Sequence, residues 1–105
     1  MKPRLTIRPQ ADRDLVEQAE YLARKAGLSV ALRFYAAAEE TFSLLAAHPE
    51  MGRARNSLDP SLSGIRMCLL RGFPKSVVFY RATGHGIEIA RVLHGARDID
   101  ALLDS

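Results

Sequence analysis

The sequence has one cysteine and few candidate metal ligands. Cys68 cannot form an internal disulfide, so the fold does not depend on an oxidising compartment and we expect a cytoplasmic protein. It lies in a strand-like run, where a small sheet residue is a more common role than a nucleophile. The three histidines, His48, His85 and His94, are scattered, and no Cys/His pair has zinc-finger spacing. We therefore expect no metal and no cofactor.

Long apolar runs are also missing. No stretch approaches the ~20 apolar residues that a membrane helix needs. The first ten residues, MKPRLTIRPQ, lack the apolar core of a signal peptide, so we expect neither secretion nor membrane insertion. No Gly-rich phosphate loop and no nucleophile elbow is present, which argues against the common nucleotide-binding and serine-hydrolase classes.

The residues that are present fit one small basic domain. The chain has 105 residues and a formal net charge of +3, with 12 arginines among its 15 basic residues. This length predicts a single domain, 1–105. Arginine suits planar contacts to carboxylate or phosphate, so a polyanion or an acidic protein is the indicated partner. A basic surface without a specific partner is the alternative reading of so small a charge.

Two amphipathic helices are predicted in the N-terminal half. Residues 4–8 alternate as a short half-buried strand, with Leu5 and Ile7 on one face, before Pro9 opens the first helix. Gly27 is predicted to end it, and Ser29 to cap a second helix after a link of about three residues. Apolar spacings of three and four define one stripe per helix. The stripes are Ala11, Leu15, Ala19, Leu22, Ala23 and Ala26, then Ala31, Phe34, Tyr35, Ala38, Phe42 and Leu45.

The C-terminal half has the pattern of a sheet. Residues 49–64 show no period and predict a long loop. Strand-like runs follow at 65–70, 76–81 and 86–93, separated by RGFPK and ATGHG. Such short connections predict an antiparallel meander. After Asp98 a final short helix is predicted.

The predicted fold class is α+β. Its elements are an N-terminal strand, an α-helical hairpin, a three-stranded antiparallel meander and a short C-terminal helix. Because each helix carries an apolar stripe, the hairpin needs a sheet to cover. The first strand is expected to join one edge of the meander.

The basic side chains of the loop and strands are the one group of residues whose chemistry could support catalysis. Neighbouring strands can gather such side chains on one face. Together with a general base they would cleave RNA, since cations stabilise the charged transition state. Local pairing at the surface, as of Arg97 with Asp98, is the alternative reading. The set is Arg53, Arg55, Arg66, Arg71, Lys75, Arg81, Arg91, His94 and Arg97.

The order and spacing of several short stretches resemble the ParE/RelE superfamily of type II toxins over almost the whole chain. These stretches are ADRDLVEQAEYLA, ALRF, HPEMGRARNSL, SGIR, FPKSVVFYR and RVLHGARDIDALL. The resemblance implies an α-hairpin packed on a small antiparallel sheet. It also implies one of two activities, because RelE-like members are ribosome-dependent RNases whereas ParE-like members poison DNA gyrase.

The departures from the RelE pattern favour the ParE branch. Cys68 stands where a second basic residue is typical, and residues 101–103 lack the usual C-terminal tyrosine. Tyr80 is interpreted as a sheet residue of the FYR stretch. A degenerate RelE-like RNase using Arg66, Lys75, His94 and Arg97 remains the alternative. A non-toxic module that only binds its antitoxin is a third possibility.

The ParE resemblance implies a non-enzymatic toxin that binds DNA gyrase and pairs with a ParD-like antitoxin, reaching operator DNA only through that antitoxin. The groove between hairpin and sheet is expected to hold an acidic amphipathic antitoxin segment. Phe42 is assigned to the core, and His94 and Arg97 could equally fix a C-terminal turn. Candidates for toxicity are Arg66, Lys75, Arg81, His94 and Arg97. Candidates for antitoxin binding are Tyr21, Tyr35, Arg53, Arg55 and Arg66.

Overall fold

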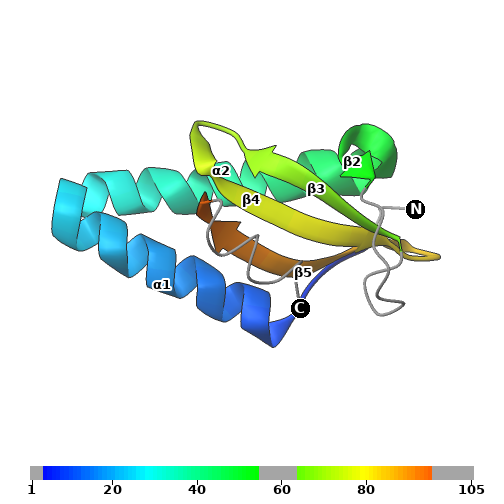
Figure 1. The fold of residues 1–105 in the computed structure, drawn as a ribbon, viewed down its shortest axis with the longest axis horizontal. Helices are drawn as coiled ribbons and strands as arrows, with labels where there is room; N and C mark the ends of the chain where they lie inside the picture. The colour runs from blue at the N-terminus through cyan, green and yellow to red at the C-terminus, as the bar shows by residue number, and fades with distance from the viewer. Residues whose placement is uncertain (1–3, 55–63, 96–105) are drawn as a thin grey trace.

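The computed structural model describes residues 4–54 and 64–95 and shows a helical hairpin packed on one face of a five-stranded sheet (Figure 1). The elements are β1 (Arg4–Ile7), α1 (Pro9–Ala26), α2 (Leu28–Ala47), the 3-10 turn η1 (Pro49–Met51), β2 (Arg53–Ala54), β3 (Ile65–Leu70), β4 (Phe73–Ala82) and β5 (Gly86–His94). The strand order is β1-β5-β4-β3-β2. The predicted α+β class is therefore confirmed, while the short C-terminal helix falls outside the described residues.

The helical hairpin forms as the apolar stripes predict, but its connection is shorter than the predicted link of about three residues. Pro9 occupies the first turn of α1, as expected. Gly27 alone joins the helices, closing α1 through its N–H to Ala23 O and preceding the first residue of α2. Its φ of 100° is a left-handed value that favours glycine. The predicted cap at Ser29 is wrong, because α2 already begins at Leu28 and no side chain caps it.

The main core lies between the hairpin and the sheet. Phe34, Phe42 and Leu45 of α2 are buried there, as expected, together with Val78 and Ile89 of the sheet. Two members of the predicted stripes lie outside it, because Ala26 is exposed at the end of α1 and Tyr35 is 40% exposed. The last turn of α1 and one flank of α2 thus extend beyond the covered area.

The sheet is a mixed one. Strands β3, β4 and β5 form the predicted antiparallel meander, and β1 joins its edge, pairing parallel with β5. The expectation that β1 is half-buried is wrong, since all four of its residues are exposed. At an edge the strand has a neighbour on one side only, so Leu5 and Ile7 keep about two fifths of their surface.

The segment predicted as one long loop begins with ordered structure. After α2 the chain forms η1 and then β2, which pairs antiparallel with β3. A two-residue strand is too short to show a period, so the pattern could not reveal it. Residues 55–63 lie outside the described part of the chain.

Strand β4 is longer than predicted because the turn before it is shorter. Only Arg71 and Gly72 form the turn, with Gly72 at φ 81°. Leu70 pairs with Phe73 but Leu69 pairs with Val77, so the residues between lie opposite no residue of β3. This irregularity accommodates Pro74, which has no N–H to donate to a ladder.

A second buried cluster lies on the sheet face away from the hairpin. It consists of Ile65, Val77, Phe79 and Leu93, each at most 6% exposed. The alternation of Val77 and Phe79 with Val78 and Tyr80 places the two clusters on opposite faces of β4.

Candidate functional site

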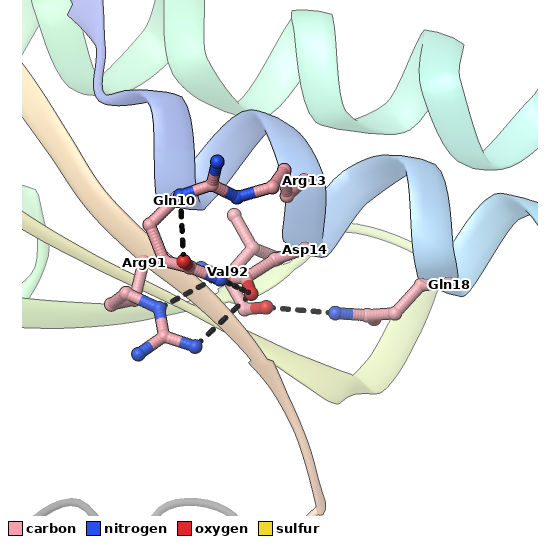
Figure 2. A network of polar contacts seen from close by, with 6 residues as sticks. All are labelled: Gln10, Arg13, Asp14, Gln18, Arg91 and Val92. Carbon is pink, nitrogen blue, oxygen red and sulfur yellow. Dashed lines mark hydrogen bonds and ion pairs between the residues drawn. The ribbon is translucent and has the colours of Figure 1, made fainter.

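Two polar side chains of α1, Asp14 and Gln18, form hydrogen bonds with the backbone of Val92 at the open edge of β5. Together with Ser76 of β4 and Arg91 of β5, which also bond them, we call these residues the edge network. Asp14 Oδ2 accepts from Val92 N at 3.0 Å and from Arg91 Nε at 2.9 Å, while Arg91 Nη2 reaches Asp14 Oδ1 at 3.1 Å. Gln18 donates to Val92 O at 2.8 Å and accepts from Ser76 Oγ. Figure 2 shows the Asp14 and Gln18 contacts from α1 to β5.

The edge network exists because β1 is shorter than β5. Pairing between them ends near Ile89, whose carbonyl accepts from Arg8 N, and the chain then enters α1 at Pro9. Beyond this point β5 presents unpaired backbone groups. A buried N–H or C=O without a partner costs about 1–3 kcal/mol, and Asp14 and Gln18 supply the missing partners for Val92.

On the β2–β3 side of the sheet a second set of residues holds the chain after α2, and we call it the turn hub: Pro49, Gly52, Arg66 and Tyr80. The Tyr80 hydroxyl accepts from Gly52 N at 2.8 Å and donates to Pro49 O at 2.7 Å. Arg66 Nη1 donates to Gly52 O at 2.8 Å. Residues from three separate stretches of the sequence, Pro49 and Gly52, Arg66, and Tyr80, therefore meet at one place.

The turn hub depends on close approach at Gly52. A Cβ at this position would lie 2.6 Å from Tyr80 Cε1 and would also overlap the hydroxyl oxygen. Its φ is −74°, so steric space rather than backbone conformation requires glycine here. Tyr80 itself is fully buried.

Burial also sets the titration of two groups near the turn hub. Desolvation raises the pKa of Tyr80, while the bond from Gly52 and the charge of Arg66 act in the opposite direction. Desolvation likewise raises the pKa of the Cys68 thiol. Both groups are therefore held in their neutral forms, which is the behaviour of packed sheet residues.

A groove of about 540 Å³ lies between α1 and the β3–β4 turn, and we call it the hairpin groove. Tyr21, Leu22 and Phe73 supply apolar walls, and Lys75 and His94 add basic groups. The remaining lining is Glu17, Gln18, Gly72, Pro74 and Ser76. Tyr21 is 49% exposed, so its ring is accessible to solvent at the groove wall.

The structure separates the residues predicted for function. Tyr21, Lys75 and His94 come together in the hairpin groove, whereas Arg66 lies in the turn hub at the other end of β4. Tyr35 does not line the groove and its ring contacts Phe34 edge-on.

The other basic candidates occupy different surfaces. By register Arg53 lies beside Met67 and Arg81 beside Ile65, which places both on the face away from the hairpin. The basic residues therefore do not gather on one face. Arg55 and Arg97 lie outside the described residues.

Asp14, Gln18 and Gly52 are structural site residues that the sequence did not reveal. Asp14 follows Ala11 at a spacing of three and precedes Gln18 at a spacing of four, so a polar group sits next to the apolar stripe of α1. The position of Asp14 beside this stripe was the one feature of the sequence that could have indicated a buried polar contact. Nothing in the sequence marks the contact of Gly52 with Tyr80, which is 28 residues away.

The geometry defines a small two-layer α+β protein with a groove beside α1 and two polar networks that fix the chain around the sheet. Among family models, the one described as the ParE toxin of the type II toxin-antitoxin system parDE matches residues 5–99. The chain belongs to this ParE toxin family.

Comparison with solved structures agrees on the fold. A chain described as the chromosomal ParDE TA system from P. aeruginosa has a TM-score of 0.73 and 22% identity, covering 90% of this chain and 97% of its own. A comparison with curated proteins finds no match. Within the described residues no helix has the length and apolar character to cross a membrane.

Proposed function

We propose that this chain is a toxin that poisons bacterial DNA gyrase, stalls it on cleaved DNA and is neutralised by a ParD-like antitoxin. The observation that carries the proposal is the family match across residues 5–99, which includes both helices, strands β2 to β5 and all of β1 except Arg4. The toxin acts as one domain by binding gyrase, and not by chemistry of its own. Contact with operator DNA occurs only through the antitoxin.

The positions of the basic residues favour this activity over RNA cleavage. An RNase site needs a base and several cations around one phosphate. Arg66 is opposite Tyr80, whereas Lys75 lies five residues before Tyr80 on β4, in the irregular stretch that pairs with no residue of β3, so the two are not neighbours across the β3–β4 pair. Arg66 is in addition bonded to the Gly52 carbonyl, and the neighbouring Cys68 thiol is held neutral.

The hairpin groove supports the antitoxin as a partner. Its apolar walls at Tyr21 and Phe73 suit the apolar face of a helical segment, and the basic groups of Lys75 and His94 suit acidic residues beside that face. We therefore propose that the antitoxin tail binds here.

The gyrase proposal is tested with purified toxin, supercoiled plasmid, gyrase and ATP. We expect linear DNA that is released only after the trapped gyrase is digested, and excess gyrase to relieve toxicity in cells. Cleavage of ribosome-bound mRNA without any linear plasmid would instead establish the RNase activity. Absence of both, with antitoxin binding retained, would leave a non-toxic binding module.

Two aromatic variants test the groove. Tyr21→Asp places a charge on the groove wall, whereas Tyr35→Asp makes the same change at a similarly exposed tyrosine outside the groove. We expect Tyr21→Asp to weaken antitoxin binding at least about tenfold while Tyr35→Asp changes it little. Equal weakening by both variants in calorimetry would contradict the assignment.

A further inference from the structure

The outer edge of β1 has the properties of a strand-binding site. Among the described residues β5 is the single strand that pairs with β1. Arg4 N and Arg8 N donate to β5 and its preceding turn, at His85 O and Ile89 O. Since backbone groups alternate in direction along a strand, the N–H and C=O groups of Leu5 and Ile7 point away from β5. These four groups can bond an added strand.

The side chains around this edge are apolar and basic. Leu5 and Ile7 are 40% and 38% exposed. Arg4, Thr6 and Arg8 alternate with them and are exposed as well. Glu88, which is opposite Thr6 on β5, is the one acidic group in register with β1. Arg81 in turn lies opposite Glu88 on β4, so the local charge remains positive.

These charges determine which strand can be added. A second copy pairing antiparallel about Thr6 would place Arg4 opposite Arg8 twice, and like charges directly opposite are destabilising. Charged residues on an edge are a common protection against such self-pairing. An acidic strand meets the same two arginines with attraction, so the edge admits it and rejects a copy of itself.

We propose that the β1 edge binds an extended acidic peptide segment by strand addition, with acidic residues opposite Arg4 and Arg8 and apolar residues opposite Leu5 and Ile7. The segment that binds here is separate from one in the hairpin groove, whose lining residues include none from β1. The proposal goes beyond the proposed function and requires neither gyrase nor an identified antitoxin.

The probe is a synthetic ten-residue peptide with the core Glu-Val-Thr-Val-Glu, added to the full-length protein at low salt. A peptide of the same composition in scrambled order and one with Lys for Glu serve as controls. We expect amide exchange to slow at Leu5 and Ile7 and binding by the acidic peptide alone. Affinity should fall several-fold as salt rises, because both arginines are exposed.

Two variants distinguish the contribution of the arginine charges to peptide binding from that of the backbone hydrogen bonds of β1. Arg4→Glu with Arg8→Glu should weaken binding about tenfold or more, whereas Arg24→Glu with Arg33→Glu makes the same change in net charge at exposed helix positions and should leave it unchanged. Leu5→Pro removes one outward N–H without removing a bond to β5, and should also weaken binding. Circular dichroism verifies that each variant is folded.

Three results would overturn the proposal. The first is absence of binding to the folded wild-type protein at millimolar peptide. The second is binding with exchange protection at Tyr21 and Phe73 of the hairpin groove and none at β1. The third is a dimer of the free protein that Leu5→Pro dissociates, since a second copy would then occupy the edge. None of these results depends on gyrase poisoning, so they leave the proposed function to its own assay.

Discussion

The turn hub and the edge network both use side chains to form hydrogen bonds with backbone groups, but the interactions in the two regions differ. Each supplies hydrogen-bond partners to backbone groups that strand pairing does not satisfy. These are Pro49 O and Gly52 N in the turn hub and the N–H and C=O of Val92 in the edge network. The turn hub does so with one buried hydroxyl in close contact with Gly52. The edge network does so with an ion pair in which the Arg91 side chain is 32% exposed and that of Asp14 is 7% exposed. We conclude that close steric contact distinguishes the first region and an ion pair the second.

The largest expected effect is that of Gly52→Ala in the turn hub. The new Cβ overlaps Tyr80, so either the ring or η1 must move. We expect a loss of about 3 kcal/mol in the free energy of unfolding, measured by urea denaturation. Gly84→Ala is the matched control, because a Cβ there meets nothing within 4 Å, and it should change stability by less than about 0.5 kcal/mol. Equal effects at both glycines would show that the hub has room to adjust.

Removing the carboxylate of the edge network should come next. Asp14→Ala removes the acceptor of Val92 N and the ion pair between Asp14 and Arg91, and we expect a loss of about 2.5 kcal/mol. Asp12→Ala removes an exposed carboxylate from the first turn of α1, two residues before Asp14, and should cost less than about 1 kcal/mol. If Asp14→Ala and Asp12→Ala lower the free energy of unfolding equally, the edge network contributes little to stability.

Tyr80→Phe removes the hydroxyl from the turn hub and keeps the ring. We expect a loss of about 1.5 kcal/mol at neutral pH, because Gly52 N and Pro49 O both lose a partner. Since burial raises the pKa of Tyr80 above the ordinary 10.0, the folded state holds this proton more tightly than the unfolded state. The contribution is therefore complete below that pH and declines as the pH rises past it.

The difference in stability between wild type and Tyr80→Phe should consequently narrow as urea titrations move to alkaline pH. Cys68, whose pKa is also raised, is present in both proteins and cancels from the difference. A gap that stays constant through pH 10.0 and beyond would contradict this account.

The smallest expected effect is the coupling energy between Asp14 and Arg91, which tests whether charge stabilises the edge network. A double-mutant cycle of Asp14→Asn and Arg91→Gln should give a coupling energy of about 1 kcal/mol, lower at high salt because Arg91 is partly exposed. The cost of Tyr80→Phe should not change over the same salt range. A salt-independent coupling would mean that hydrogen-bond geometry, and not charge, holds the edge network.

Local patterns were sufficient for the elements themselves. Spacings of three and four gave both helices, and alternation gave the run Ile65–Leu70. Burial of an apolar stripe then required a sheet under the hairpin. The error at Ser29 arose because a good capping residue was available, while Gly27 reversed the chain in a single residue.

The candidate sites were less accessible to this reasoning. Tyr21, Lys75 and His94 were identified individually, but their meeting in one groove depends on how α1 lies beside the start of β4 and the end of β5. Arg66 was expected on a shared basic surface and instead bonds the Gly52 carbonyl. Side-chain type indicated chemistry, whereas the strand register decided which groups meet.

By itself the sequence determined the helical hairpin, the antiparallel meander and the resemblance to ParE toxins, because periodicity and short motifs are properties of neighbouring residues. The tertiary structure alone decided that β1 pairs parallel at an open edge, that Asp14 bonds Val92, and that Gly52 lies against Tyr80. These contacts join residues far apart in the chain. Their energy comes from satisfying backbone groups whose need for a partner arises only once the strands have paired.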